Sequence, residues 1–264
     1  DEFLKLLAHK SIGKGRTCVF LHGFLESSNM WQGLPLIDLK VHCLFVDLPG
    51  HGKSDFSVTH PPQRGIEQMA IQVIALIEYL GIEKFDIIGH SMGGYVALEV
   101  KRLKTQCEKV VLLNSNFWTD TPNRVIDRKR VATIVQKNKT FFLQNAIPGL
   151  FVNPNKFKVE ISELIAEACE IDSSAIAYAS LAMALRRDFT KLIPLNDLYV
   201  IHALADRLVS AELFKVHGIL DGHFFELQHA GHMSHMESPD ELIQALKVIL
   251  KDFKSNSNST VGNF

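Results

Sequence analysis

Residues 89–94 constrain the fold of this chain more than any other segment, because they read Gly-His-Ser-Met-Gly-Gly between two apolar runs. The run before them is short and rich in Ile and Phe, which is typical of a buried strand. The run after them has the apolar spacing of a helix start. Glycines two positions before and two after Ser91 permit a sharp reversal of the backbone. We therefore expect Ser91 Oγ to be exposed at the end of a strand and the start of a helix, although a Gly-rich turn that merely packs helix on strand is the alternative.

The wider sequence predicts an α/β fold with a mostly parallel central sheet flanked by helices. Short apolar runs that end in Gly, Pro or Asp alternate with longer segments of helical periodicity, as in parallel sheets. A helix is expected over residues 64–80 and ends at Gly81. The predicted strands are residues 17–21, 42–47, 85–89, 110–114, 198–203 and 224–228.

One interval interrupts this alternation. Residues 116–189 contain helical patterns punctuated by prolines and no good strand. We therefore predict that residues 1–115 and 190–254 form the core, that residues 116–189 are an inserted helical cap, and that the Ser/Asn-rich residues 255–264 are a disordered tail. The region before Thr17 looks short by about one strand, because only residues 3–9 lead into it.

A serine hydroxyl is a weak nucleophile at neutral pH, so it needs a histidine base and an acid that orients the histidine. Asp206 follows the predicted strand 198–203, and His232 follows the predicted strand 224–228. Because active sites of parallel sheets form beyond the carboxyl ends of the strands, Ser91, Asp206 and His232 are expected to converge as a catalytic triad. The alternative role of Asp206 is to cap a helix.

Other acids and histidines fit these roles less well. Asp197 and Asp221 precede their strands and therefore lie at the wrong edge of the sheet. His232 follows Gly231 in a loop that is free to turn inward, whereas His229 lies nearer the strand and His235 nearer the next helix. His229 and His235 remain alternatives for the base.

Backbone N–H groups are expected to stabilise an oxyanion beside Ser91. One donor is Met92, which follows the nucleophile, and the second is Phe24, in the loop after the strand 17–21. His22 is expected to brace that loop. We place His22, His90 and Trp118 at the substrate pocket. Arginines of the insertion offer a possible carboxylate site, although solvated helix faces explain most of them: Arg124, Arg128, Arg130, Arg186 and Arg187.

Composition excludes several classes of partner. A formal net charge of -1 gives no field that attracts nucleic acid. No segment approaches the roughly 20 apolar residues of a membrane span, and the four cysteines lack metal-ligand spacing, so we expect buried thiols and a cytoplasmic protein. No metal and no organic cofactor are predicted, and the partner is a small-molecule substrate. The sequence does not fix an oligomeric state.

Four ordered motifs together resemble the α/β-hydrolase superfamily, in its serine-nucleophile branch with a helical cap. They are His22-Gly23-Phe24, the segment 47–54 (Asp-Leu-Pro-Gly-His-Gly-Lys-Ser), the segment 89–94, and Gly231-His232 followed by Glu237 and Pro239. The resemblance implies a nucleophile elbow at Ser91 and an oxyanion loop at His22-Gly23-Phe24. Ala203 departs from the glycine that many members carry before the acid. A serine nucleophile excludes the dehalogenase and epoxide hydrolase branches, which need a carboxylate.

The function predicted from these residues is hydrolysis of a small, largely apolar ester through an acyl-enzyme on Ser91. One alternative is a lyase or C–C bond hydrolase that uses the same triad as a base. His90 and Tyr95 differ from the residues common in the pyruvate-eliminating enzyme of that group, which disfavours it. A second alternative is a ligand receptor that retains the hydrolase scaffold.

Overall fold

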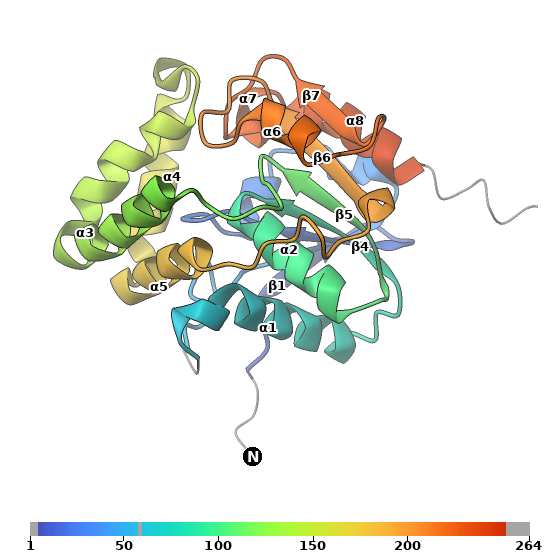
Figure 1. The fold of residues 1–264 in the computed structure, drawn as a ribbon, viewed down its shortest axis with the longest axis horizontal. Helices are drawn as coiled ribbons and strands as arrows, with labels where there is room; N and C mark the ends of the chain where they lie inside the picture. Colours follow the sequence, from blue (N-terminus) through green and yellow to red (C-terminus); the bar gives the residue numbers. More distant parts are fainter. Residues whose placement is uncertain (1–4, 58–59, 252–264) are drawn as a thin grey trace, which may run out of the picture.

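A seven-stranded sheet with helices on both faces forms the core of the computed structural model, which describes residues 5–57 and 60–251 (Figure 1). Its spatial order is β1-β3-β2-β4-β5-β6-β7. All neighbours pair in parallel except β1 and β3, which are antiparallel. The strands are β1 His9–Ile12, β2 Thr17–Leu21, β3 His42–Val46, β4 Phe85–His90, β5 Cys107–Leu113, β6 Leu198–Ala203 and β7 Phe224–Leu227.

The first strand corrects the expectation that the chain is one strand short before Thr17. β1 pairs with β3 at the edge of the sheet, with His9 opposite Val46 and Ile12 opposite Cys43. All four of its residues are exposed. An exposed, largely polar edge strand has no apolar run to mark it in the sequence, which is why the pattern missed it.

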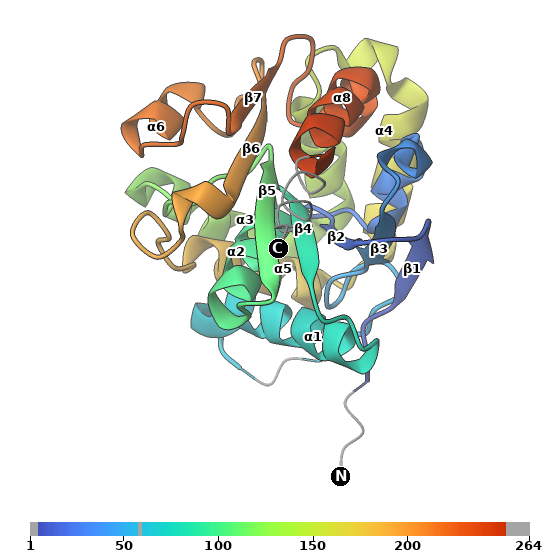
Figure 2. The same cartoon turned by 90° about the vertical axis from the view of Figure 1, so that its right-hand side faces the viewer.

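Two apolar clusters lie on the two faces of the sheet. Figure 2 shows helices on both sides of the strands. Helices α1 (Gly65–Tyr79) and α2 (Met92–Leu103) pack on one face together with Phe214 of the short helix α6 (Ala211–Val216). Helix α8 (Pro239–Lys251), preceded by α7 (Ser234–Glu237), covers the other face. The helix expected over residues 64–80 is therefore present within one residue at each end.

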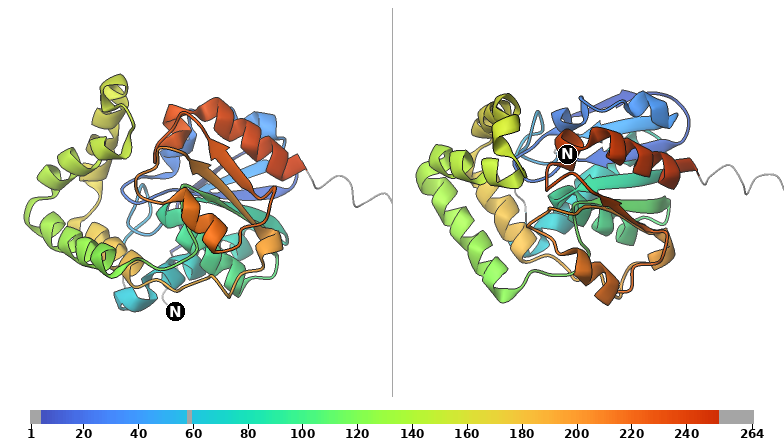
Figure 3. Two further views of the ribbon diagram at one scale, coloured as in Figure 1. Left: turned by 45° about the horizontal axis from the view of Figure 1, so that its top comes forward. Right: turned by 90° about the horizontal axis from the view of Figure 1, so that it is seen from above.

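Three helices fill the chain between β5 and β6 and stand to one side of the sheet (Figure 3). They are α3 (Pro122–Ala146), α4 (Lys158–Glu170) and α5 (Ser173–Ala184). Most of their buried apolar side chains form a third cluster that includes Leu25 and Met233, from the loops after β2 and β7, whereas Ala179, Ala182 and Met183 of α5 join the cluster of α1 and α2. The helices therefore lie over the carboxyl ends of the strands. The cap boundaries stay a prediction, and the predicted tail 255–264 lies outside the described residues.

Helix α3 bends at Asn138, whose φ of -154° and ψ of 77° are not helical. The Asn138 side-chain oxygen accepts a hydrogen bond from Phe141 N–H at 3.1 Å, as an N-cap does. The neighbouring Lys139 Nζ donates to the backbone oxygens of Cys169 and Ile171, at 2.5 and 2.6 Å. The bend is thus held by side chains, and the two halves of α3 point in different directions.

Within the described residues, no helix is both long and apolar enough to cross a membrane. Cysteines 18, 43 and 107 are buried free thiols, and Cys169 is half-buried and also free.

The chain turns from β4 into α2 at a single residue. Ser91 has a φ of 49° and a ψ of -113°, which few residues other than glycine adopt. A Cβ on Gly89 would lie 2.3 Å from the Gly93 carbonyl carbon, and one on Gly93 would lie 2.6 Å from the His22 carbonyl oxygen. Glycine at both positions allows the strand, the helix and the neighbouring β2 end to approach closely.

Substitution of Gly89 tests this close approach. Because the added methyl group would meet backbone atoms that cannot rotate away, we expect Gly89→Ala to lower the free energy of unfolding by about 2–4 kcal/mol. Gly33→Ala is the matched control, since no atom lies within 4 Å of its added Cβ, and it should change the value by less than about 0.5 kcal/mol. Urea unfolding measures both variants, and equal effects would contradict the packing argument.

Candidate active site

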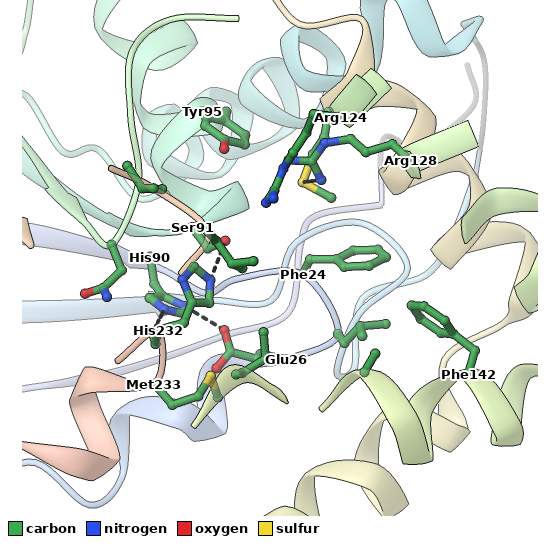
Figure 4. A pocket seen from close by; sticks show the side chains of 17 residues that line it. Phe24, Glu26, His90, Ser91, Tyr95, Arg124, Arg128, Phe142, His232 and Met233 are labelled. Atoms are coloured by element: carbon green, nitrogen blue, oxygen red, sulfur yellow. Dashed lines mark hydrogen bonds and ion pairs between the residues drawn. The ribbon is translucent and has the colours of Figure 1, made fainter. Parts of the chain in front are cut away.

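Three loops at one edge of the sheet bring Ser91, His232 and Asp206 into one hydrogen-bonded chain. Ser91 lies between β4 and α2, Asp206 follows β6, and His232 follows β7. His232 Nε2 is 3.0 Å from Ser91 Oγ, and His232 Nδ1 is 3.0 Å from Asp206 Oδ2. Figure 4 shows the contact between Ser91 and His232 at the wall of a cavity.

Asp206 determines which nitrogen of His232 carries a proton. Burial alone would raise the pKa of Asp206, but the charge and hydrogen bond of His232 outweigh it, so the pKa lies below its usual value. The Leu208 N–H donates to Oδ1 at 2.8 Å, and Asn114 Nδ2 donates to Oδ2 at 3.1 Å. An ionised carboxylate accepts but does not donate, so His232 Nδ1 must donate to it. In the neutral ring Nε2 is then free to accept the Ser91 hydroxyl proton.

The other two histidines of this loop are arranged differently. His229 is exposed, and its Nδ1 contacts Glu241 Oε1 at 2.7 Å. His235 is buried, and burial lowers its pKa to about 4. Within the described part of the chain neither one contacts Ser91, so the structure places His232 alone of the three beside it.

A buried ion pair behind His232 was not foreseen from the sequence. His90 Nδ1 is 2.7 Å from Glu26 Oε2, and His90 Nε2 is 2.9 Å from the His232 backbone oxygen. Both partners accept hydrogen bonds, so both ring nitrogens must donate and the ring is an imidazolium. Burial lowers the pKa of His90, but Glu26 outweighs it and raises the pKa overall. Burial likewise opposes the charge on Glu26, yet His90 brings the pKa of Glu26 to about 2.

The pair joins three segments that are distant in sequence. Glu26 Oε2 also accepts the Gly23 N–H at 2.9 Å, so it holds the loop after β2. His90 holds the end of β4 and, through the His232 carbonyl, the loop after β7. The one sequence signal for Glu26 was a carboxylate directly after the apolar residues Phe24 and Leu25. Its partner is 64 residues away, and no spacing rule connects them.

The predicted oxyanion donors lie beside this chain of side chains. Phe24 borders the cavity together with Ser91, and Met92 is the first residue of α2. Among the described residues, neither the Phe24 nor the Met92 N–H has a hydrogen-bond acceptor. Both groups are therefore available to a bound molecule.

The cavity in front of Ser91 lies between the sheet and α3 (Figure 4). Of the three predicted pocket residues, His90 lines it, whereas His22 and Trp118 do not. His22 Nε2 accepts the Leu48 N–H at 2.9 Å, and Trp118 stacks on His217 with ring centroids 4.7 Å apart. Most of the lining is apolar: Phe24, Leu25, Tyr95, Phe142, Ala146, Leu150, Met183, Leu208, Val209 and Met233.

Comparison with known proteins shows the family. A model of the alpha/beta hydrolase family matches residues 18–245, so this chain belongs to that family. Among solved structures, a thermophilic esterase from Thermogutta terrifontis has a TM-score of 0.82 and 25% identity, with 93% of each chain covered. These matches confirm the predicted fold class and support a hydrolase as the coarse functional class.

Two curated relatives are longer proteins. The chain is 25% identical over 248 residues to the dihydrolipoyllysine-residue acetyltransferase component of an acetoin cleaving system from Pseudomonas putida, which covers 90% of this chain and 65% of that protein. It is 24% identical over 295 residues to protein PHYLLO of Arabidopsis thaliana, covering 98% of this chain and 17% of PHYLLO. The chain therefore spans less than two thirds of either relative.

The buried pair makes a prediction about stability and pH. Glu26→Gln keeps the shape of the side chain but leaves the His90 charge without its partner, so the free energy of unfolding should fall by about 3 kcal/mol near pH 6. Glu241→Gln is the control, because its partner His229 is exposed and the loss should stay below about 1 kcal/mol.

The pH dependence of the stability follows from the opposite directions in which folding shifts the pKa values of Glu26 and His90. Folding lowers the pKa of Glu26 from 4.5 to about 2, so its contribution is present above 4.5 and is lost as pH falls toward 2. Folding raises the pKa of His90 above 6.5, so its contribution is complete below 6.5 and is lost as pH rises through the folded value. Urea unfolding across this range should show the largest difference between wild type and Glu26→Gln at about pH 5–6. A difference that does not vary with pH would contradict the ion pair.

Proposed function

We propose that this chain is a carboxylesterase-like serine hydrolase that cleaves a small, largely apolar ester through an acyl-enzyme on Ser91. The observation that carries the proposal is the hydrogen-bonded chain from Ser91 Oγ to His232 and on to Asp206, with both contacts at 3.0 Å. A nucleophile, a base and an orienting acid in that order are what acyl transfer to a hydroxyl requires.

In the proposed first half-reaction, His232 Nε2 takes the Ser91 hydroxyl proton while Oγ forms a bond to the acyl carbon. The carbonyl electron pair moves to oxygen, where the unpaired N–H groups of Phe24 and Met92 stabilise the negative charge. The C–O bond to the alcohol then breaks, and His232 returns its proton to the departing oxygen. In the second half-reaction His232 takes a proton from water while the water oxygen bonds to the acyl carbon. The bond to Ser91 Oγ then breaks, His232 returns the proton to Oγ, and the acid is released.

The lining of the cavity supports the substrate class. Phe24, Phe142 and Met183 present apolar groups within the same cavity as Ser91. Such walls favour an acyl or alcohol group with little polarity, since its burial contributes about 25 cal/mol per Å². The structurally similar Thermogutta terrifontis protein is also an esterase.

Removal of the nucleophile tests the proposal. Ser91→Ala should lower kcat/KM for short p-nitrophenyl esters by about 10³-fold or more, because no acyl-enzyme forms without the hydroxyl group. Ser210→Ala is the matched control, since that serine is exposed and its side chain caps no helix, and it should retain wild-type activity. Cleavage by Ser91→Ala at the wild-type rate would overturn the mechanism.

A fluorophosphonate probe gives a second readout that does not depend on knowing the substrate. Mass spectrometry should find the probe on Ser91 of the wild-type protein and no labelling of the Ser91→Ala protein. A wild-type protein that neither labels nor turns over esters would contradict the proposal and favour a ligand receptor.

A further inference from the structure

Two arginines of α3 face the same cavity as Ser91. Arg124 and Arg128 are four residues apart, so they lie on one face of the helix, and both line the cavity. Figure 4 shows their side chains reaching from α3 toward the space in front of Ser91 and Tyr95. The first half of α3 is oriented by Thr121, whose hydroxyl accepts the Arg124 backbone N–H.

The two guanidinium groups differ in what surrounds them. Arg128 pairs with Asp120 and places Nη1 3.2 Å from Met183 Sδ. Asp120 is shared, because its other oxygen accepts from Arg186 at 2.9 Å. The Arg124 side chain is half-buried, and among the described residues it has no hydrogen-bond or ion-pair partner.

The remaining charges of the cavity wall do not offset Arg124. Glu26 is the one carboxylate among the residues that line it, and Glu26 is already paired with His90. Other arginines of the region are paired elsewhere, Arg130 with Asp127 and Arg187 with Glu99. A half-buried cation beside apolar groups loses solvation without a partner to compensate. The cavity therefore has an uncompensated positive charge on the wall that α3 provides.

We propose that Arg124 binds a carboxylate of the substrate, so that the enzyme cleaves esters whose acyl or alcohol part carries one carboxylate group. The proposal rests on the proposed function and refines its substrate class: the ester group is at Ser91, the carboxylate is at Arg124, and an apolar chain between them lies along Phe142 and Met183. A carboxylate is a suitable partner for Arg124 because its single negative charge balances the charge of the guanidinium group. Its two oxygens can also accept two parallel hydrogen bonds from the planar guanidinium.

The test compares charged and neutral esters of the same shape. The charged substrates are the p-nitrophenyl half-esters of succinate, glutarate and adipate. Each neutral counterpart ends in an isopropyl group, which has the shape of a carboxylate without its charge. The full chain is assayed as wild type, Arg124→Gln and Arg130→Gln, with spontaneous hydrolysis subtracted. Arg130 is the matched control because it is on the same helix, is exposed and does not line the cavity.

For the half-ester of best length, Arg124→Gln should lower kcat/KM by roughly 10- to 100-fold through loss of a charge-assisted hydrogen bond. Its kcat/KM for the neutral counterpart should stay within about twofold of wild type, and Arg130→Gln should keep both wild-type values. If Arg124→Gln lost kcat/KM equally on the charged and the neutral ester, the carboxylate site would be overturned. The same holds if the variant kept the wild-type preference for the charged ester at all three chain lengths. Turnover of the neutral esters that requires Ser91 would meanwhile uphold the proposed function.

A binding measurement separates the two proposals if no ester is turned over. Methyl hydrogen adipate is added to the Ser91→Ala protein and to the Ser91→Ala, Arg124→Gln double variant, and Tm is recorded. A rise in Tm that requires Arg124 supports the carboxylate site whatever the fate of the proposed reaction. The same rise in both proteins, or none in either, would overturn it.

Discussion

The turn at Ser91 is the constraint on which the candidate active site depends. A serine with a φ of 49° between a strand and a helix is strained, and the surrounding contacts must hold it there. Glycines 89 and 93 make this possible, because neither leaves room for a Cβ beside the neighbouring backbone. The contact of Gly93 with the His22 carbonyl also brings the loop after β2 beside the turn. The same close approach therefore brings the loop that contains Phe24 to the cavity that Ser91 also lines.

The ion pair of Glu26 and His90 adds a second constraint, this time on the loops. Taking two charges out of water costs several kcal/mol, and the pair offsets this cost through mutual attraction and further hydrogen bonds. Those bonds end on the Gly23 N–H and on the His232 carbonyl. A buried pair with such partners favours one arrangement of three loops over many others. The hydrogen bond from His232 to Ser91 benefits from that restriction, although neither Glu26 nor His90 contacts the Ser91 hydroxyl in the described structure.

Local patterns in the sequence were enough to predict the parallel strands and the residues that meet at their carboxyl ends. Burial supplies the reason, since strands such as β2 and β6 are buried along their whole length and are therefore almost continuously apolar. The edge strand β1 carries no such pattern. The sequence also could not predict that Glu26 pairs with His90, or that Arg124 has no partner among the described residues. Both facts depend on which side chains from distant segments lie next to each other. Trp118 was predicted to line the pocket only because it is aromatic. In the structure it stacks on His217 instead and does not line the cavity.

The bend at Asn138 has a consequence for how the cavity accepts molecules of different length. Arg124 and Arg128 precede the bend, and Phe142 and Ala146 follow it, so a single helix supplies both a charged wall and an apolar wall. Two sets of hydrogen bonds determine the angle between these walls. One is made by the Asn138 side chain, and the other joins Lys139 Nζ to backbone oxygens at the end of α4. A sequence change at this one joint would open or narrow the space while leaving every lining side chain the same. Substrate range in such a chain can therefore change through backbone geometry alone, with the same side chains lining the cavity.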